Sequence, residues 1–582
     1  MAKLRKSSPR ILFPYLLKYK KHWVGGLLAV TLTEAFKLAG PWILGDAINA
    51  LESGVTKERL LQYAAAIVGV ILVSAIFRFI MRQTMIVASR RVEYDFRNDF
   101  FRHLLTLDRK YYDKTPTGDI MARATNDMDS VRSMIGPGIM YACSTAVTLA
   151  LTLPLMIKIS PGLTVYSMIP MPFITVLVFF LGREVNKRYT KIQEQYSAIT
   201  ARAQESFSGI RVVKAYTQEK AEIAEFSLLN SDYIKKNMSM VKVWAMFFPA
   251  IVMFSGTAAI MALWFGGQYV MDRSITLGGF VKFTAYLMNL IWPMAALGWV
   301  AGLYQRGKAS LVRIEQILQA KPYIVNVPNP VSRDIIGKIE LKNLRFGYNS
   351  TEVLRGITTV IEPGMNVALI GATGCGKTTL ISLLLRAYPV ERGMIYIDDV
   401  DINDWDLRSL RTQIAPVMQE TFLFSETIRS NIAYGNYDQS METVADFAAA
   451  AGMAGEIEEF PKKFDTLLGE RGITLSGGQK QRTALARALS SDPRVLLLDD
   501  AFSSVDTHTE EEILSNLRQI LKGKTSIMIS HRISTVKDAD AIMVLDDGNI
   551  VEHGDHDNLI SLDGHYAKLY KRQLLESELE EL

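Results

Sequence analysis

Long apolar runs fill the first half of the chain, and six of them reach the roughly 20 residues that a helix needs to cross a bilayer. They lie at residues 22–45, 61–86, 134–157, 160–182, 243–270 and 277–302. The connections near 46–60, 158–161 and 271–276 are short, whereas the segments 87–133 and 183–242 are long and charged. The pattern predicts an α-helical membrane domain of six transmembrane helices, with both long segments as helical extensions on one side of the bilayer.

The charges at the N-terminus indicate which side of the membrane these extensions occupy. Residues 1–21 contain seven Lys and Arg and no acid, so the positive-inside rule places the N-terminus in the cytoplasm. Residues 9–21 have the pattern of an amphipathic helix that lies against lipid headgroups. A signal peptide is disfavoured, because the first span is too long and no small-residue cleavage site follows it. We expect a multi-pass protein of the cytoplasmic (inner) membrane, surrounded by membrane lipid, with the second half of the chain in the cytoplasm.

Charged residues fall within the predicted spans, among them Glu34 and Lys37 near the middle of the first, and Arg78 and Arg82 in the second. A charge at that depth is costly and indicates a functional site. Two alternatives stay open. Glu34 and Lys37, one turn apart, either pair with each other or face a water-filled cavity, or Glu34 contacts a transported substrate. Stretches such as Trp292–Met294 could line an adaptable cavity, although ordinary helix packing explains most of them.

The long apolar runs end before residues 319–336, a segment that contains three prolines and is typical of a linker. Short β-branched runs then alternate with helical patterns. Val367–Ile370 is apolar enough for a buried strand, and residues 377–385 have a helical pattern. We predict a membrane domain over residues 1–318, a linker over 319–336 and an α/β P-loop nucleotide-binding domain over 337–582.

A complete P-loop separates that strand from that helix, made of Gly371, Ala372, Thr373, Gly374, Cys375, Gly376, Lys377 and Thr378, with Thr379 next. Its glycines let backbone N–H groups wrap phosphates, and the helix N-terminus adds its dipole. Lys377 would neutralise the β- and γ-phosphates, and Thr378 would reach Mg²⁺. Because the strand–loop–helix context is present, we predict that this domain binds ATP with Mg²⁺.

Two further motifs follow the P-loop. Val495–Leu498 is an apolar run suited to a central parallel strand, and Asp499 follows where Mg²⁺ would sit beside the phosphates. Leu475–Gln479 opens a helical stretch with Ser476 as its N-cap. The second motif is either a plain helix start or an anion site with no nucleotide of its own in this chain.

Composition excludes some classes of protein. With two cysteines in 582 residues, Cys143 in an apolar run and Cys375 in the P-loop, a disulfide framework is excluded, and a reduced compartment fits the soluble half. The net charge of +5 comes without a basic patch interleaved with aromatic residues, so no nucleic-acid partner is expected. Cys375, beside Lys377 and a helix N-terminus, is either an activated thiol or an inert residue at a variable position.

Tyr348, Gln419, Ser503–Asp506 and His531 join the motifs above in the order and spacing of an ABC-transporter ATPase. Together with the six spans, the whole chain resembles an exporter-type half-transporter, and in particular the subunits of heterodimeric bacterial multidrug exporters. In such ATPases two nucleotide domains face head to tail, so each ATP lies between the P-loop of one chain and the Leu-Ser-Gly-Gly-Gln signature of the other.

The resemblance implies roles for individual residues. Tyr348 would stack on adenine, Gln419 would touch Mg²⁺ or water, and His531 would contact the γ-phosphate. Ser476, Gly477, Gly478 and Gln479 would hold the partner's nucleotide, and Asp506 would belong to a loop that contacts the other chain. Ser476, Gln419, His531 and Asp500 are the expected catalytic residues, and Thr378, Gln419 and Asp499 the expected Mg²⁺ site.

Three segments resemble parts that connect the two halves of an exporter. Tyr112–Asp119 and Lys214–Lys220 lie midway along the two long charged segments and resemble coupling helices, which transmit closure of the ATPase dimer to the spans. Gly469–Gly472, just before the signature, resembles a loop that meets those helices. The alternative for this last segment is a solvated charged turn.

Asp500 departs from the family pattern, because a Glu normally follows the Mg²⁺-binding acid. Removing one methylene withdraws the carboxylate by about 1.5 Å, and a misplacement of about 1 Å can cost ~10²-fold in rate, or about 2.7 kcal/mol of barrier. We therefore expect this site to hold ATP and hydrolyse it poorly, in a heterodimer with a second half-transporter that carries the Glu. The alternative is a homodimer in which Asp500 acts as a weaker base.

The leading functional prediction is ATP-driven export of hydrophobic or amphipathic small molecules, drugs included. A lipid or lipid-linked flippase shares the same architecture and remains an alternative. A third alternative is an ATP-gated channel or sensor that responds to nucleotide binding rather than to turnover. An importer is disfavoured, because its membrane and ATPase parts are usually separate chains.

Overall fold

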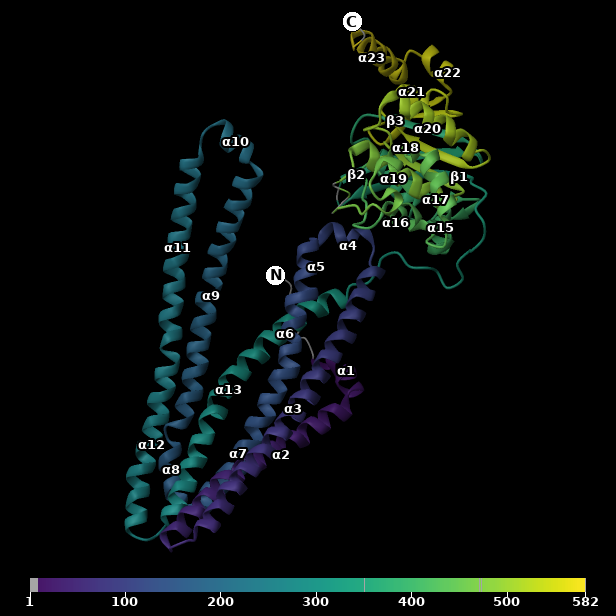
Figure 1. Cartoon of the computed structure of the whole chain (residues 1–582). Helices are drawn as coiled ribbons and strands as arrows, with labels where there is room; N and C mark the ends of the chain where they lie inside the picture. Colours follow the sequence, from purple (N-terminus) through teal and green to yellow (C-terminus); the bar gives the residue numbers. More distant parts are fainter. Residues whose placement is uncertain (1–8, 350, 470–471, 473, 581–582) are drawn as a thin grey trace. The chain divides into compact units, whose positions relative to one another are not determined.

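The computed structural model describes residues 9–349, 351–469, 472 and 474–580, which form two compact units. The first is helical and comprises the described residues up to Thr106 together with Thr115–Ala320. The second comprises Leu107–Lys114 and the chain from Lys321 onward, and it contains the β-strands. The two units are described separately below, and Figure 1 labels their elements.

The helical unit confirms the six predicted spans: within the described residues, six helical stretches are long and apolar enough to cross a membrane. Several are much longer than a bilayer requires; α3, with 50 residues, extends about 75 Å. The charged segments are therefore continuations of spanning helices. The helices are α2 (Lys20–Glu52), α3 (Lys57–Thr106), α5 (Thr117–Ala122), α6 (Met128–Ser133), α7 (Ile139–Ile159), α8 (Pro161–Met168), α9 (Met171–Ser208), α10 (Ile210–Ala215), α11 (Glu219–Ala245), α12 (Phe247–Met271) and α13 (Leu277–Leu318).

The predicted N-terminal helix forms over a shorter stretch than 9–21. A 3₁₀ turn, η1 (Pro9–Leu12), leads into α1 (Phe13–Lys18), and the chain bends at Tyr19 before α2 begins. Polar side chains fix this segment to α3: the Tyr15 hydroxyl donates to Asp99 (2.8 Å), and Lys18 and Tyr19 both donate to Asp95 (2.7 and 2.9 Å).

Glu34 and Lys37 pair, as one of the two alternatives proposed. The Lys37 ammonium lies 3.7 Å from one carboxylate oxygen of Glu34, and the Ser144 hydroxyl donates to the other at 2.7 Å. Glu34 is buried between helices by these contacts. Arg78 and Arg82 are exposed on α3.

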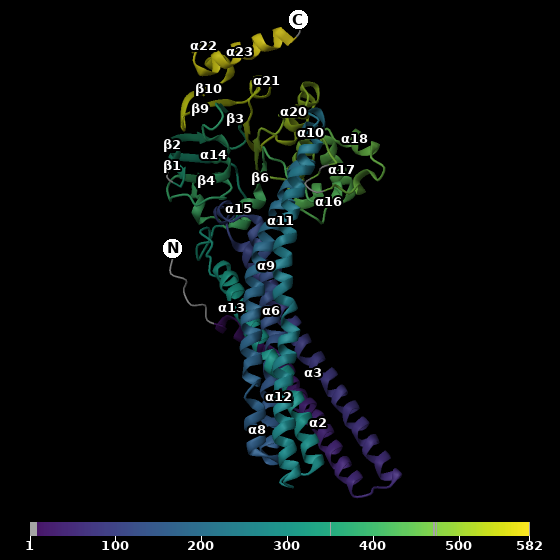
Figure 2. The same ribbon diagram turned by 90° about the vertical axis from the view of Figure 1, so that its left-hand side faces the viewer.

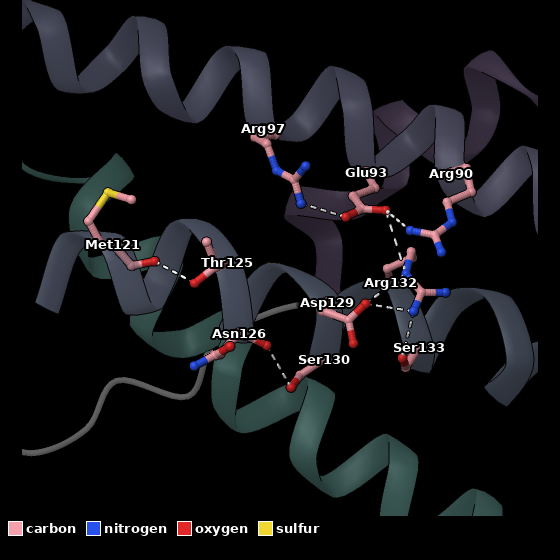
Figure 3. Close-up of polar contacts among 10 residues, drawn as sticks. All are labelled: Arg90, Glu93, Arg97, Met121, Thr125, Asn126, Asp129, Ser130, Arg132 and Ser133. Carbon is pink, nitrogen blue, oxygen red and sulfur yellow. Dashed lines mark hydrogen bonds and ion pairs between the residues drawn. The ribbon is translucent and has the colours of Figure 1, made fainter. Parts of the chain in front are cut away.

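The third span contains two π-helical turns, η2 (Arg123–Asp127) and η3 (Met134–Gly138), the second of which holds Pro137. Between them Arg132 pairs with Asp129 and approaches Glu93 on α3, whose buried carboxylate also accepts from Arg90 and Arg97 (Figure 3). On its other side the span is held to α13, where Ser310 donates to Asp127 at 2.8 Å and Arg313 forms an ion pair with the same carboxylate. Buried charges thus fix this extension to two neighbours.

Helices α9 and α11 form the other long extension and lie side by side in both ribbon views, with α10 at their common end (Figures 1 and 2). Arg202 of α9 pairs with Glu222 (2.8 Å) and Glu225 (2.6 Å) of α11. The predicted segment Lys214–Lys220 lies at this end, where Lys214 pairs with Glu219 at 2.8 Å.

The second unit is built on two sheets. A six-stranded sheet has the order β10-β9-β3-β8-β7-β6 and is parallel apart from its edge strand β10; a four-stranded antiparallel sheet has the order β2-β1-β4-β5. The central strands β7 and β8 are buried along their whole length, as apolar runs suited to a parallel sheet.

The strands are β1 (Ile339–Tyr348), β2 (Thr351–Ile361), β3 (Asn366–Gly371), β4 (Ile395–Ile397), β5 (Val400–Asp401), β6 (Ile414–Val417), β7 (Val495–Asp499), β8 (Thr525–Ile529), β9 (Ala541–Asp546) and β10 (Asn549–Gly554). The α-helices of this part of the chain are α14 (Lys377–Leu384), α15 (Leu407–Gln413), α16 (Ile428–Ile432), α17 (Met441–Ala450), α18 (Ala454–Glu459), α19 (Gly477–Ser490), α20 (Thr507–Ile520), α21 (Ile533–Val536), α22 (His556–Ser561) and α23 (His565–Glu580). Parallel strands bring their carboxyl ends to one edge of the sheet, which is where such sheets bind ligands.

The short helix α4 (Arg109–Lys114) packs with this second unit rather than with the helices on either side of it in the chain. Tyr388 donates to Asp113 at 2.6 Å, and the Arg109 guanidinium lies 5.9 Å from the Tyr388 ring centre. The segment is also held at its start, because the Tyr323 backbone N–H donates to Asp108 at 2.6 Å. The predicted coupling segment Tyr112–Asp119 thus begins on a helix that is packed against the α/β fold.

Candidate functional site

The P-loop connects β3 to α14, with strand and helix within one residue of the predicted bounds. Two of its glycines have positive φ and no room for a side chain. A Cβ on Gly371 (φ 152°) would lie 2.0 Å from the Leu545 carbonyl oxygen, and one on Gly376 (φ 110°) would lie 2.5 Å from Leu354. The backbone can therefore curl tightly here, as a phosphate-binding loop must.

A cavity of about 320 Å³ opens at this loop. It gathers residues from segments that are far apart in the sequence. Most follow the carboxyl ends of the parallel strands, and Tyr348 and Val353 come from the antiparallel sheet. Its lining comprises Tyr348, Val353, Thr373, Gly374, Gly376, Lys377, Thr378, Thr379, Gln419, Asp499, Asp500, Ile529 and His531. The structure thus brings together most of the predicted nucleotide-binding residues, whereas Gly371, Ala372, Cys375 and the signature residues 476–479 are outside this lining.

Lys377 is buried at the mouth of the loop. Its ammonium donates to the carbonyl oxygens of Gly371 (2.8 Å) and Ala372 (2.9 Å). A positive charge is therefore held where phosphate oxygens would arrive. Cys375 is only 7% exposed and belongs to the hydrophobic core beneath the loop, which favours the inert alternative for this thiol.

Asp499 ends β7 with a side chain that is almost completely buried. Burial raises the pKa of its carboxyl, and a hydrogen bond from Thr378 opposes this rise. Within the described part of the chain, its Oδ2 atom is buried without a hydrogen-bond partner. An unpartnered carboxylate oxygen beside a threonine hydroxyl fits the oxygen ligands that Mg²⁺ prefers.

Asp500 has a left-handed backbone conformation (φ 50°). Aspartate tolerates this conformation better than glutamate does, so the short side chain also suits the backbone at this position. The Asp500 N–H donates to the Ile529 carbonyl at 3.0 Å, which fixes the residue to β8. The Gln419 amide nitrogen lies 3.5 Å from the Asp500 carboxylate, so the two residues predicted to handle water face each other across the cavity.

Ser476 is the N-cap of α19, as predicted. Its hydroxyl accepts the Gln479 N–H (3.2 Å), and the Gln479 side chain accepts the Ser476 N–H (2.9 Å), so the pair forms a capping box. Glu456 of α18 then fixes the first turn by accepting from Gln479 (2.7 Å) and Arg482 (2.5 Å). The signature is thus a rigid helix start that lies outside the P-loop cavity.

Sequence reasoning missed two glutamines. Gln481 is buried on α19 and donates to Ser503 at 2.8 Å, while its carbonyl oxygen accepts the Ser504 N–H at 3.0 Å. It therefore ties the signature helix to the loop that follows Asp500. A polar residue on the same helix face as Ala484, Leu485 and Ala488 was the signal that could have found it.

Gln573 of α23 is the second missed residue. It accepts the Ile533 N–H at 2.9 Å and donates to the His531 carbonyl, so it fixes the backbone on both sides of Arg532. The imidazole of His531 itself lines the cavity. No local pattern marks Gln573, because it lies 42 residues further along the chain.

The remaining predicted segments have structural partners. Asp506 caps α20 by accepting the Thr509 N–H at 2.9 Å, and the hydrogen bonds from Thr509 lower the pKa of its carboxyl. Ser503 and Ser504 contact Gln481 as described. In the Gly469–Gly472 segment, residues 470 and 471 lie outside the described residues, and the predicted role of that segment with them.

A second cavity, of about 1310 Å³, lies within the helical unit between α7, α9, α11, α12 and α13. Its lining includes Tyr141, Phe179, Trp244, Phe247, Phe248, Trp292 and Trp299. It is large enough for a drug-sized molecule, for which pockets of ~300–1,000 Å³ are typical.

Two family models match the chain: "ABC transporter transmembrane region" over residues 23–294 and "ABC transporter" over residues 354–503. A "Probable multidrug resistance ABC transporter ATP-binding/permease protein YheI" from Bacillus subtilis is 35% identical over 96% of both chains. The chain belongs to the ABC exporter family. An "ATP-dependent lipid A-core flippase" from Syntrophus aciditrophicus is 33% identical to this exporter over 98% of its chain and 94% of the relative.

A solved structure has the same fold over almost the whole chain. The "Structure of a bacterial Atm1-family ABC exporter with ATP bound" matches this exporter with a TM-score of 0.80 and 28% identity, covering 95% of its chain and 98% of the other. This exporter is thus a multi-pass membrane protein whose ABC domain binds ATP and drives translocation.

Proposed function

We propose that this chain is one half of a heterodimeric multidrug-type exporter whose two ATP sites differ in catalytic power. The observation that carries the proposal is that the predicted ATPase residues lie in two separate places on the domain. The P-loop cavity contains Lys377, Thr378, Asp499 and the short acid Asp500, while the intact signature at Ser476 lies elsewhere on the domain.

The P-loop cavity supports binding of ATP with Mg²⁺. The buried ammonium of Lys377 is positioned for the phosphates, and the unpartnered oxygen of Asp499 together with Thr378 would hold the metal. Bound there, Mg²⁺ supplies positive charge that offsets the negative charge of the phosphates. Tyr348 at the end of β1 lines the same cavity and offers a ring for the adenine base.

Hydrolysis at this site is expected to be slow. A general base must lie within hydrogen-bond reach of the water that it polarises. Asp500 is about one C–C bond, or ~1.5 Å, shorter than Glu, and Gln419 is the neighbouring polar group at 3.5 Å. His531 still faces the cavity and would contact the γ-phosphate. We therefore expect ATP to bind here and the two nucleotide domains to close on it, although ATP cleavage at this site is slow.

The signature serves the nucleotide of the partner in this proposal. The Ser476 hydroxyl accepts the Gln479 N–H, which leaves its own hydrogen free to donate to a phosphate. The N-terminus of the 14-residue α19 adds the positive end of its dipole. Gly477 and Gly478 lie against Ser504, so this helix start and the loop of Asp506 form one surface for the second chain.

The transported substrates are amphipathic small molecules, and the N-terminus and the ATPase domain lie in the cytoplasm. The aromatic lining of the membrane cavity and the similarity to YheI support this assignment. A lipid flippase is the second candidate function, because the lipid A-core flippase relative is matched over almost its whole length.

Two measurements test the proposal. Affinity purification of the tagged chain from native membranes, followed by mass analysis of the intact complex, should give one copy of this chain and one of a different half-transporter that carries Glu after its Mg²⁺-binding Asp. A complex of two identical chains would contradict it. Uptake of an amphipathic dye into inside-out vesicles should require ATP and fail with a non-hydrolysable analogue, whereas a nucleotide-gated channel would respond to both.

A further inference from the structure

The large membrane cavity has an unbalanced charge. Arg183 of α9 and Arg306 of α13 line it, beside the polar side chains of Asn186 and Gln305. None of the described residues that line it is acidic. The acid next to Arg183 in sequence, Glu184, is engaged elsewhere, because it accepts from Arg188 at 2.9 Å. Both cavity arginines are exposed, so two positive charges face the space without a compensating carboxylate in its wall.

The helix geometry places these charges at one end of the cavity. Helices α9 and α13 touch where a Cβ on Gly298 would lie 2.9 Å from Val178 and where Thr175 donates to the Met294 carbonyl at 2.7 Å. From that contact both helices continue toward their C-terminal ends, and Figure 1 shows α13 leaning away from α9. Arg183 lies five residues beyond Val178, about 7.5 Å, and Arg306 eight residues beyond Gly298, about 12 Å.

Aromatic residues line the same cavity, and one of them lies level with Arg183, because the contact of Arg188 with Ser239 of antiparallel α11 places Trp244 opposite that arginine. Phe179 and Trp299 lie next to the helix contact, Trp292 lies on its other side, and Trp244 and Phe248 come from the α11–α12 junction. The cavity is therefore itself amphipathic, with aromatic walls and two cationic groups. Aromatic walls favour flat apolar groups, and guanidinium groups bind carboxylates, sulfonates and phosphates through charge-assisted, often bidentate hydrogen bonds.

From this arrangement we infer that the exporter selects amphiphiles that carry an acidic group, with Arg183 and Arg306 binding the anion and the aromatic residues enclosing the apolar part. The inference rests on the proposed export function and specifies its substrate class. A cationic amphiphile would gain contacts with the aromatic faces but would meet two like charges with no acid to offset them. The ligand is a small molecule rather than a phospholipid, because the charges and the aromatic residues line one cavity.

The test compares three probes that share one fluorescent body: 1-pyrenebutyric acid, 1-pyrenebutanol and 1-pyrenebutylamine. ATP-dependent uptake is measured in inside-out vesicles that contain the native complex. We expect the acid to be taken up with a half-saturating concentration at least about tenfold below that of the alcohol or the amine. Arg183→Gln with Arg306→Gln should remove this advantage, so that the half-saturating concentrations of the acid and the alcohol become equal.

The matched control is Lys187→Gln with Lys308→Gln. It removes the same charge from the same two helices, within four residues of each arginine, at exposed positions that do not line the cavity. The control should leave uptake of the acid unchanged. Equal loss in both double variants would show a general effect of membrane charge and overturn the inference.

Other outcomes distinguish a failure of the anion selectivity from a failure of the proposed export function. If the alcohol is pumped with ATP but the acid has no advantage, or its advantage survives in R183Q/R306Q, the anion selectivity is wrong and export stands. If no probe is pumped, and fluorescent phosphatidylglycerol instead moves between leaflets in a manner that depends on both arginines, the ligand is a lipid and both proposals fail. Charge reversal, with Arg183→Glu and Arg306→Glu, should favour the amine.

Discussion

The amide nitrogen of Gln419 lies 3.5 Å from a carboxylate oxygen of Asp500. The two residues follow β6 and β7, which are neighbouring parallel strands whose carboxyl ends meet at the ATP cavity. Gln419 therefore lies next to the carboxylate that we propose polarises water. The shortened side chain of Asp500 thus lies on the side of the cavity where the attacking water is expected.

Restoring the methylene should have two opposite effects. Asp500→Glu is expected to raise the turnover of the complex, because the carboxylate gains about 1.5 Å of reach. It should also destabilise the domain by about 1 kcal/mol, because Glu tolerates the left-handed backbone at φ 50° less well than Asp. Steady-state ATPase and thermal unfolding of the purified complex measure both effects. Asp500→Asn, which also tolerates this conformation, is the control for the change in stability.

The buried Asp499 makes the stability of the nucleotide-free domain depend on pH. Its pKa in the folded domain is raised above the ordinary value near 3.8, so the carboxyl stabilises the fold while protonated. This contribution is lost as pH rises through the folded pKa, and at neutral pH the charged group is a penalty. Asp499→Asn should therefore raise the melting temperature at pH 7, by about 2–4 °C for each kcal/mol.

The same Asp499→Asn variant should abolish the additional stabilisation that Mg²⁺ gives to the ATP-bound domain, since the unpartnered oxygen is removed. Melting curves with ATP alone and with ATP and Mg²⁺ provide the comparison. A variant that melts lower without nucleotide, or that keeps its response to Mg²⁺, would contradict the assignment of Asp499 as a metal ligand.

Glu456 is predicted to position the signature without touching nucleotide. It holds Gln479 at 2.7 Å and Arg482 at 2.5 Å, so Glu456→Gln replaces an ion pair by a weaker hydrogen bond. We expect turnover to fall about 3- to 10-fold with little change in ATP affinity at the P-loop site. Glu458→Gln, on the same helix but paired with the exposed Lys463, should behave as the unmodified protein. Equal losses of turnover in the two variants would contradict a positioning role for Glu456.

The packing of α4 against the ATPase fold depends on Tyr388. Its hydroxyl donates to Asp113 at 2.6 Å, and burial together with this hydrogen bond raises its pKa. Tyr388→Phe should therefore weaken the attachment by about 1 kcal/mol, equivalent to ~5-fold faster amide hydrogen exchange in residues 109–114. The exposed Tyr437→Phe serves as the control. Unchanged exchange in Tyr388→Phe would show that other contacts hold α4.

The parts of the fold that could be predicted are those specified by local patterns. Apolar runs of sufficient length define the spans, and the strand–glycine–helix order defines the P-loop to within one residue. Ser476 was predictable because a capping box lies within four residues. Glu34 and Lys37, one turn apart, form the pair that one of two alternatives proposed.

The features that could not be predicted depend on contacts between distant segments. Gln573 reaches His531 from 42 residues away, and Tyr388 meets Asp113 across 275 residues. The loop after Asp500, which has a left-handed backbone, is held by Gln481 from α19. Arg183 and Arg306 are adjacent to one cavity only because α9 and α13 touch at Gly298.

The central claim is tested most directly by comparing the ATPase turnover of two single variants of the purified complex, Asp500→Asn and Ser476→Asp. Asp caps a helix as well as Ser does, so the second variant keeps α19 intact, which thermal unfolding checks, while its charge repels the phosphates of the partner's ATP. We predict that Asp500→Asn leaves steady-state ATPase within about 2-fold, whereas Ser476→Asp lowers it about 10²-fold or more. Severe and equal losses in both variants would contradict an asymmetric pair of sites.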